Sequence, residues 1–230
     1  MKEKELNQFS RLELLIGCEN VELLKNKSVL IVGLGGVGGF VTESLARSGI
    51  GNISIVDYDT VDITNINRQI IALHSTLGKK KTELFEKRIL DINPNCNVTV
   101  YDAFLDENNF SSIVNDKYDF VIDCCDSVPT KKLLLFETYK RKIPFISSMG
   151  TANKMNPTLL KIVDIKETIN DPLARIIRKY VKDINIKESV MVLSSSELPK
   201  KNGVNLGSNS FVPASAGLLI SSYVINNLIK

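Results

Sequence analysis

Short apolar runs alternate with longer segments of helical periodicity over the first 150 residues of the chain. Runs rich in valine, isoleucine and phenylalanine predict strands at 28–32, 53–56, 98–101, 120–122 and 144–147. Between them, apolar residues recur at helical spacing at 37–46, 82–92 and 131–141. This alternation predicts right-handed βαβ crossovers, and therefore an α/β fold with a Rossmann-like, mostly parallel sheet and helices on both faces.

The pattern changes after Gly150. Strands are predicted at 158–163 and 189–193, separated by a helix that opens with Asp171-Pro172, a capping residue followed by a preorganised first turn. We therefore expect a C-terminal extension with mixed or antiparallel pairing. The polar segment 194–207 predicts a loop, and the interrupted apolar stretch 211–229 predicts a buried or amphipathic helix, not a membrane span.

The chain is expected to form a single domain in three parts. Residues 1–26 would be an N-terminal helical arm, residues 27–150 the Rossmann-like core, and residues 151–230 an extension on the substrate side. The 230 residues are 43% hydrophobic and 24% charged, which is typical of a globular chain with a sizeable core. A net charge of +3 excludes a uniformly basic surface, so any contact with a nucleic acid must be local.

A glycine-rich motif, Gly33-Leu34-Gly35-Gly36-Val37-Gly38, follows the first predicted strand and opens the first predicted helix. Glycines in this context let backbone N–H groups approach phosphate oxygens, and the helix N-terminus adds partial positive charge. Asp57 ends the next strand, where a carboxylate can hold ribose hydroxyls. The motif in this setting predicts a nucleotide site, and the alternative is a tight turn without a ligand.

A dense polar segment, residues 57–69, runs on from that strand with acids, amides and Arg68. Lys81 opens a later predicted helix, and Asp126 follows the strand at 120–122. A hydride-transfer site has no obvious need of these groups. An enzyme that joins a carboxylate to the α-phosphate of ATP does, because its crowded anionic transition state requires Arg or Lys and usually Mg²⁺. Taken singly, Lys81 could lie on a solvated helix face and Asp126 could cap the following helix.

Together these motifs resemble the E1-like superfamily of ATP-dependent adenylating enzymes, which includes ubiquitin-activating E1, MoeB and ThiF. The resemblance is carried by the glycine motif, the segment 57–69, the Gly-Lys-Lys-Lys helix start at 78–81 and the Asp-Cys-Cys-Asp turn at 123–126. Three further segments, 65–70, 169–174 and 211–214, resemble the tRNA threonylcarbamoyladenosine dehydratase branch, called TcdA or CsdL. The resemblance therefore extends over nearly the whole chain.

That branch implies an adenylating ligase and cyclase that uses ATP and Mg²⁺. It activates the carboxylate of N6-threonylcarbamoyladenosine at position 37 of tRNA, and the ring then closes. By resemblance, the residues that would bind ATP are Gly33, Gly35, Gly36, Gly38, Asp57 at the ribose, Asp59, and, at the phosphates, Asn65, Arg68 and Lys81. Asp126 would hold Mg²⁺, and Arg11 would reach the ATP of the partner subunit, which makes a homodimer part of the mechanism.

The cysteines bear on the choice of branch. They are Cys18, Cys96, Cys124 and Cys125, with no C-x-x-C pair and none in the later half of the chain. This pattern argues against a paired-cysteine zinc site and against a thioester-forming nucleophile. Cyclisation needs neither, because an atom of the same nucleoside attacks the activated carboxyl group. Cys124 and Cys125 are therefore expected to be buried structural thiols.

The start of the chain has no apolar targeting segment, which favours a cytoplasmic location and reduced cysteines. His74, the only histidine, is expected to pack or hydrogen-bond and not to bind a metal. The helix after Asp171 carries four cations on one face, a candidate contact with tRNA phosphates, with further lysines in the next loop: Arg175, Arg178, Lys179, Lys182, Lys200 and Lys201.

Three other functions stay open at this point. The chain could adenylate the C-terminus of a ubiquitin-like sulfur-carrier protein, as MoeB and ThiF do. It could be an NAD(P)-dependent oxidoreductase, which shares the glycine loop and the acidic strand end but leaves Arg68, Lys81 and Asp126 unexplained. It could also be a non-catalytic nucleotide-binding scaffold. Sulfur-transfer or redox proteins are further possible partners, whereas no membrane partner is expected.

Overall fold

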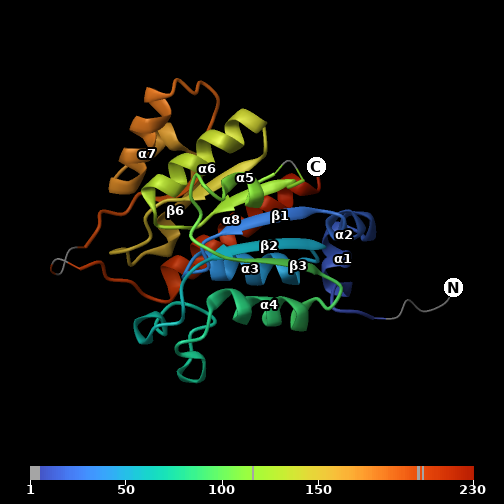
Figure 1. Cartoon of the computed structure of the whole chain (residues 1–230). Coiled ribbons are helices and arrows are strands. Elements are labelled where there is room, and N and C mark those ends of the chain that lie inside the picture. The colour runs from blue at the N-terminus through green and yellow to red at the C-terminus, as the bar shows by residue number, and fades with distance from the viewer. Residues whose placement is uncertain (1–5, 116, 201–202, 204) are drawn as a thin grey trace.

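The structure is a computed structural model of the chain that describes residues 6–115, 117–200, 203 and 205–230. Within these residues one sheet of seven strands has the order β3-β2-β1-β4-β5-β7-β6 (Figure 1). All neighbouring strands are parallel except β6 and β7, which are antiparallel. The strands are β1 (Ser28–Val32), β2 (Asn52–Asp57), β3 (Asn97–Asp102), β4 (Phe120–Asp123), β5 (Phe145–Ser148), β6 (Leu160–Asp164) and β7 (Met191–Ser195). The predicted Rossmann-like, mostly parallel sheet with a mixed extension is confirmed.

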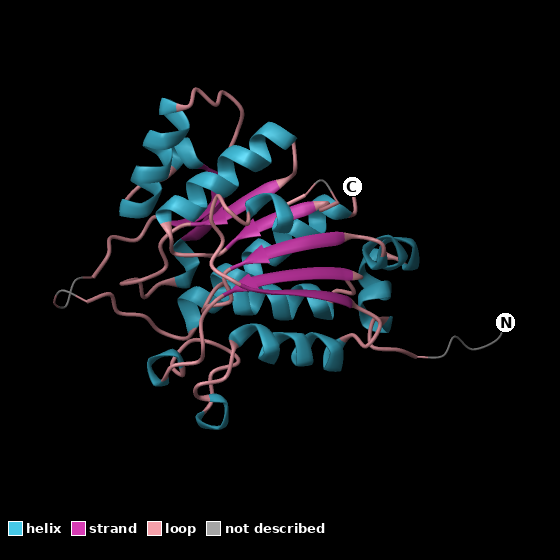
Figure 2. Cartoon of the chain, viewed as in Figure 1, coloured by secondary structure: helices cyan, strands magenta, loops and turns pink. Residues whose placement is uncertain are grey.

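Helices cover both faces of this sheet (Figure 2). They are α1 (Ser10–Ile16), α2 (Cys18–Lys25), α3 (Gly38–Arg47), α4 (Lys81–Ile92), α5 (Phe110–Ile113), α6 (Val128–Arg141), α7 (Pro172–Asp183) and α8 (Phe211–Leu228). One predicted strand begins late. The Asn156 side chain accepts a hydrogen bond from the Thr158 N–H, which caps a 3₁₀ turn at Pro157–Leu159, so β6 starts at Leu160 and not at 158.

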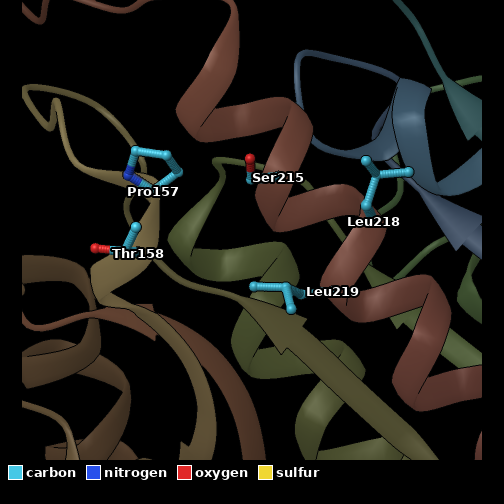
Figure 3. Close-up of a pocket in the computed structure, with 5 residues that line it drawn as sticks. All are labelled: Pro157, Thr158, Ser215, Leu218 and Leu219. Atoms are coloured by element: carbon cyan, nitrogen blue, oxygen red, sulfur yellow. The ribbon is translucent and has the colours of Figure 1, made fainter.

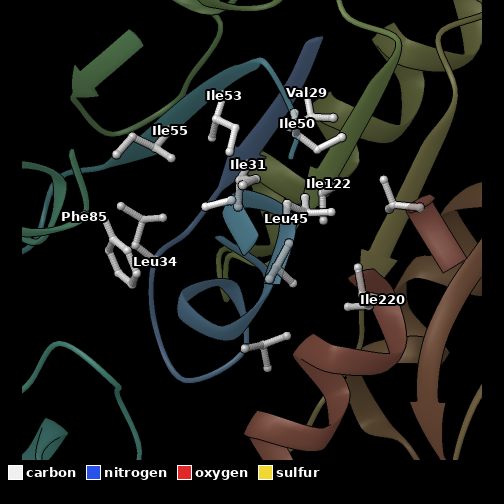
Figure 4. Close-up of a cluster of buried hydrophobic side chains, with 14 of the residues drawn as sticks. Val29, Ile31, Leu34, Leu45, Ile50, Ile53, Ile55, Phe85, Ile122 and Ile220 are labelled. Carbon is white, nitrogen blue, oxygen red and sulfur yellow. The ribbon is translucent and has the colours of Figure 1, made fainter. Parts of the chain in front are cut away.

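Strand β1 supplies side chains to both halves of the core because successive residues of a strand point to opposite faces. Val29 and Ile31 belong to a cluster with α3, α4 and α8, part of which is drawn in Figure 4. Leu30 and Val32 belong to a second cluster with α5 and α6. The strand is therefore buried on both sides, as central strands of parallel sheets are.

Helix α8 packs along α3, where Gly217 allows a close approach: a Cβ there would lie 2.6 Å from the Val37 carbonyl oxygen. Its length and composition would also suit a membrane span. In the structure, however, its residues Val212, Ile220 and Val224 are fully buried in the core cluster. A shallow apolar pocket of about 440 Å³ lies between the outer side of α8 and the turn at Pro157–Leu159 (Figure 3).

Two details of the sequence prediction are wrong. The buried face of α7 is formed by Ala174, Ile177 and Val181, whereas Ile176, expected on that face, is 42% exposed. The helix is rotated to suit its packing on α6 and β7. His74 does not pack in the interior, because it is exposed in a short 3₁₀ turn.

The N-terminal arm is helical from Ser10 onward, and residues 1–5 lie outside the described residues. Helix α2 is anchored by Val21 and Leu24, which are fully buried. Helix α1 buries none of its residues, and its Leu14 and Leu15 are 80% and 81% exposed. The arm therefore presents an apolar helix to the outside of the single chain.

Candidate active site

The predicted site residues gather where the strand order reverses. Strand β1 has β2 on one side and β4 on the other, and the chain leaves these strands toward opposite sides of the sheet. In open α/β sheets, ligands bind in the crevice outside the carboxyl ends of strands at such a point. The glycine motif follows β1, Asp57 ends β2 and Asp126 comes three residues after β4. The fold therefore brings together three segments that are far apart in sequence.

The glycine turn is crowded by neighbouring backbone. Gly33 has a φ of 90°, and a Cβ there would lie 2.7 Å from the Cys125 nitrogen. A Cβ on Gly38 would lie 1.8 Å from the Gly33 carbonyl oxygen. Neither position admits a side chain, and no side chain caps the start of α3. Because the first amides of a helix have no intrahelical partner, this turn can donate hydrogen bonds to an anion.

Two carboxylates and a lysine organise the end of β2. Asp57 is buried, and its Oδ2 and Oδ1 accept hydrogen bonds from the Leu34 N–H at 2.6 Å and the Asp59 N–H at 2.8 Å. Asp59 is 47% exposed and forms an ion pair with Lys81, whose Nζ is 2.8 Å from Oδ2 and whose side chain is only 5% exposed. The solvated alternative for Lys81 is therefore wrong, because this ammonium is held beside the nucleotide crevice.

Arg68 lies against the glycine turn. A Cβ on Gly36 would approach the Arg68 Cγ at 3.4 Å and the Pro213 Cβ at 3.1 Å, so the segment 57–69 and the start of α8 meet there. The Arg68 Nη1 donates to the Thr64 carbonyl at 2.7 Å and to the Asn67 Oδ1 at 2.9 Å. This arginine is half-buried and pairs with no described carboxylate, so its charge remains for an anionic ligand.

Asn65 and Gln69 shape the same segment. The Asn65 Oδ1 accepts a hydrogen bond from the Asp62 N–H, which closes a 3₁₀ turn. Gln69 is buried near Gly35, and its Oε1 has no hydrogen-bond partner in the structure. An orphaned buried acceptor is costly unless something else pairs with it, so its position near the turn fits a site that holds a polar ligand.

Asp126 is exposed at the crevice and does not cap α6. Ser127 is the cap, because its Oγ accepts a hydrogen bond from the Thr130 N–H, so the capping alternative is wrong. The Tyr58 pKa is raised by the Asp59 charge, by burial, and by the Asp126 and Asp57 charges, which places three carboxylates around this tyrosine. Among the residues the structure describes, no three metal-binding side chains form a cluster. A single carboxylate suits Mg²⁺, which completes its coordination with phosphate oxygens and water.

A buried polar network behind Asp126 was not predicted. Lys131 and Asp123 form an ion pair of 2.9 Å with side chains 1% and 0% exposed. The Lys131 Nζ also donates to the Ser147 Oγ and the Ser148 carbonyl oxygen. Burial lowers the Lys131 pKa, but the Asp123 charge outweighs it and the net shift is upward. Lys131 is indistinguishable from Lys132 in the sequence, so only the rotation of α6 reveals it.

The same network holds the turn that carries Asp126. The Asp123 Oδ1 accepts hydrogen bonds from the Cys125 N–H at 3.1 Å and its Sγ–H at 3.0 Å. Burial raises the pKa of both Cys124 and Cys125, and the Asp123 charge adds to the shift. Both thiols are therefore protonated at neutral pH, which fits the expected structural role better than nucleophilic attack.

Arg11 is exposed on α1 and makes no hydrogen bond or ion pair with any described residue. The single chain therefore does not bring it to the other site residues. Its predicted role across a dimer stays a prediction.

Taken together, the fold and this crevice define an α/β protein that binds a nucleotide at a glycine turn, with a lysine, an arginine and carboxylates around the phosphate position. The sequence matches the ThiF family over residues 9–188, and the chain belongs to that family.

Two tRNA-modifying relatives and one other adenylating enzyme illustrate the match. The chain is 44% identical to the tRNA threonylcarbamoyladenosine dehydratase of Bacillus subtilis, over 98% of this chain and 96% of that protein. Structures of Escherichia coli tRNA N6-threonylcarbamoyladenosine dehydratase, TcdA, with AMP and with ATP each match 96% of this chain with a TM-score of 0.92 and 34% identity. They are covered to 94% and 93%. E. coli molybdopterin-synthase adenylyltransferase is 33% identical over 67% of this chain and 62% of that protein.

Proposed function

We propose that this chain is an ATP-dependent tRNA threonylcarbamoyladenosine dehydratase. The observation that carries the proposal is the 44% identity to a named dehydratase along nearly the full length of both chains. The crevice is consistent with it, because Lys81 and Arg68 supply positive charge beside an amide-lined turn. The enzyme would activate the carboxylate of N6-threonylcarbamoyladenosine at position 37 of tRNA and then cyclise it.

In the first step, an oxygen of that carboxylate attacks the α-phosphate of ATP, and pyrophosphate leaves. In the second, an atom of the same nucleoside attacks the acyl-adenylate carbon, and AMP leaves, so that the nucleoside loses one water overall. The amides of residues 33–38 and the cations of Arg68 and Lys81 would stabilise the charge that grows on the phosphates. Asp59, the more exposed of the two acids after β2, would hold the ribose together with Asp57, and Asn65 would contact the phosphates.

Mg²⁺ fits this site through Asp126, an exposed carboxylate beside the crevice, together with phosphate oxygens of the nucleotide. When bound, the ion would neutralise phosphate charge and favour departure of pyrophosphate. Asp126 is kept in place by its turn, because the Asp123 carboxylate holds Cys125.

The proposal includes a homodimer in which Arg11 reaches the partner's ATP. Support comes from α1, which presents Leu14, Leu15 and Arg11 to solvent in the single chain. An apolar helix of this kind is normally covered by a partner. We place the enzyme in the cytoplasm, with tRNA, a second copy of the chain and sulfur-transfer or redox proteins as partners and without a membrane anchor.

Ligand-induced thermal stabilisation separates the proposal from an oxidoreductase. A ligand at 100 times its Kd adds about 2.7 kcal/mol to the free energy of unfolding. ATP with Mg²⁺ should therefore raise the Tm, and NADH should not. Stabilisation by NADH alone would contradict the proposal.

Nucleosides from cells that lack the gene separate the proposal from activation of a sulfur-carrier protein. The cyclic nucleoside at position 37 should disappear, and threonylcarbamoyladenosine should accumulate in its place. Gentle extraction is needed because the cyclic form is labile. An unchanged amount of cyclic nucleoside would favour the sulfur-carrier alternative, for which the chain has no paired-cysteine zinc motif.

A further inference from the structure

A hollow of about 560 Å³ lies on the outer side of α7. Six of the nine residues that line it are cations: Lys166, Arg175, Arg178, Lys179, Lys182 and Lys187. The others include Val181 and Ile186, which are buried and form its apolar floor. We refer to this hollow, with its six cations, as the α7 basic pocket. In the sequence, only its helical part could be recognised, because Lys166 and Lys187 come from the segments on either side of α7.

Among the described residues, none of the six cations forms an ion pair, whereas nine lysines and arginines elsewhere do. Lys166 donates to the Lys187 and Glu188 carbonyl oxygens, which fixes one edge of the hollow. The nearest acids in sequence do not line it: Asp183 and Glu167 are exposed beside it, and Glu188 accepts a hydrogen bond from Tyr139. The hollow therefore concentrates uncompensated positive charge on a chain whose net charge is only +3.

The position of α7 connects this charge with the active-site edge of the sheet. The helix starts at its N-cap Asp171, whose Oδ2 accepts a hydrogen bond from the Gly150 N–H at 3.0 Å, just past the carboxyl end of β5. In Figure 1, α7 lies at the upper left, on the side toward which β1 and β2 point. From Arg175 to Lys187 the cations span roughly 18 Å at a helical rise of about 1.5 Å per residue. That length is more than one small anion needs and suits successive groups of a chain.

We propose that the α7 basic pocket binds the phosphodiester backbone of the tRNA substrate while the position 37 nucleoside occupies the crevice. The inference rests on the proposed function and adds where the rest of the RNA lies. Lysine ammonium groups and arginine guanidinium groups both bind phosphate, and they contribute sequence-independent affinity that weakens with salt. A substrate of tRNA size needs such contacts away from the reacting nucleoside to be held in register.

The test replaces three exposed cations that make no structural hydrogen bond, as Arg175→Gln, Lys179→Gln and Lys182→Gln in one protein. Arg178 is left in place, because it donates to the Thr168 Oγ1 and carbonyl oxygen and fixes the segment before α7. The matched control removes three exposed lysines outside α7, as Lys25→Gln, Lys87→Gln and Lys117→Gln. Both variants keep all residues placed in the crevice, and ATP binding is followed separately by thermal shift.

Filter binding to tRNA that carries threonylcarbamoyladenosine is measured between 50 and 200 mM salt, a range where about 0.7–0.9 units of slope are lost per phosphate contact. The triple α7 variant should lose about two units of slope and on the order of 10² in affinity at 0.1 M salt. The control should keep most of its affinity, and both should bind ATP like the parent.

Affinity and slope of the α7 variant equal to those of the parent would overturn the inference and leave the proposed function intact. An equal loss in the control would also overturn it, because the effect would then follow net charge alone. If ATP binding fell in parallel with tRNA binding, the pocket would be acting on the crevice and not on RNA. A parent protein that neither binds nor cyclises this tRNA would overturn the proposed function, and the inference with it.

Discussion

Replacement of Lys131 by methionine would leave a buried carboxylate without its counter-charge. In the parent protein the Asp123 carboxylate is fully buried, 2.9 Å from the Lys131 ammonium. Methionine has a similar length and no charge, so the substitution removes the ion pair and opens little space. We expect Lys131→Met to lower the free energy of unfolding by about 3–5 kcal/mol, the usual cost of breaking a buried pair by removing one partner.

Urea denaturation measures this cost if the m value of the variant stays that of the parent. The matched control is Lys132→Met. Lys132 lies next in sequence and is half-buried, with its ammonium 5.2 Å from the centre of the Tyr180 ring. A partly exposed contact of this kind contributes about 0.5–1 kcal/mol. A double variant, Lys131→Met with Asp123→Asn, should recover most of the lost stability, because the remaining amide carries no charge.

The network also predicts a functional effect beyond stability. Asp123 holds the Cys125 amide, and Asp126 follows in the same turn, so Lys131→Met should weaken stabilisation by ATP with Mg²⁺ more than Lys132→Met does. A cost below about 1 kcal/mol for Lys131→Met, with an unchanged response to ATP, would refute the reasoning that this pair positions the turn.

Three further predictions concern the site and the arm. Arg68→Ala and Lys81→Met should each lower pyrophosphate release by on the order of 10²-fold or more without loss of the folded state, because these cations are proposed to stabilise charge that develops in the transition state; near-parent release would contradict this. An Arg11→Ala subunit mixed with an Asp126→Ala subunit should recover activity, because one site of the mixed dimer combines two intact halves; no recovery after proven subunit exchange would return Arg11 to its own subunit. Burial raises the Glu43 pKa, but hydrogen bonds and charges from Arg88 and Arg47 outweigh it, so the net shift lies below the ordinary value of 4.5. The stability from this depressed pKa is present above pH 4.5 and lost as the pH falls below it, so Glu43→Gln should show a smaller loss in acid than the parent, and identical acid profiles would refute the role of Glu43.

Regular elements could be predicted from the sequence because their signals are local. An apolar run bounded by a glycine located β1 to the residue, and the Asp171-Pro172 signal located the start of α7. The beginning of β6 was missed because a single side-chain hydrogen bond from Asn156 sets it. Periodicity also left the rotation of α7 undecided between neighbouring apolar positions, and the contacts with α6 and β7 decided it.

The candidate site shows the same division. The glycine motif and the polar segment after β2 announced themselves through residue type and spacing, and the structure brings Lys81 to Asp59 and Arg68 to the glycine turn. The Lys131–Asp123 pair had no such signal. A lysine next to another lysine on a helix is typical of a solvated face, and only the packing of α6 onto β4 and β5 shows that one of them is buried.

The most direct test is reconstitution with purified protein, ATP, Mg²⁺ and tRNA that carries threonylcarbamoyladenosine at position 37. The account predicts that the nucleoside loses one water, as seen by mass spectrometry after gentle digestion, with one AMP and one pyrophosphate formed for each nucleoside converted. The Asp126→Ala variant and NADH in place of ATP should both give none of this product. Unchanged nucleoside in the complete reaction, with a protein shown to be folded and to bind ATP, would contradict the account.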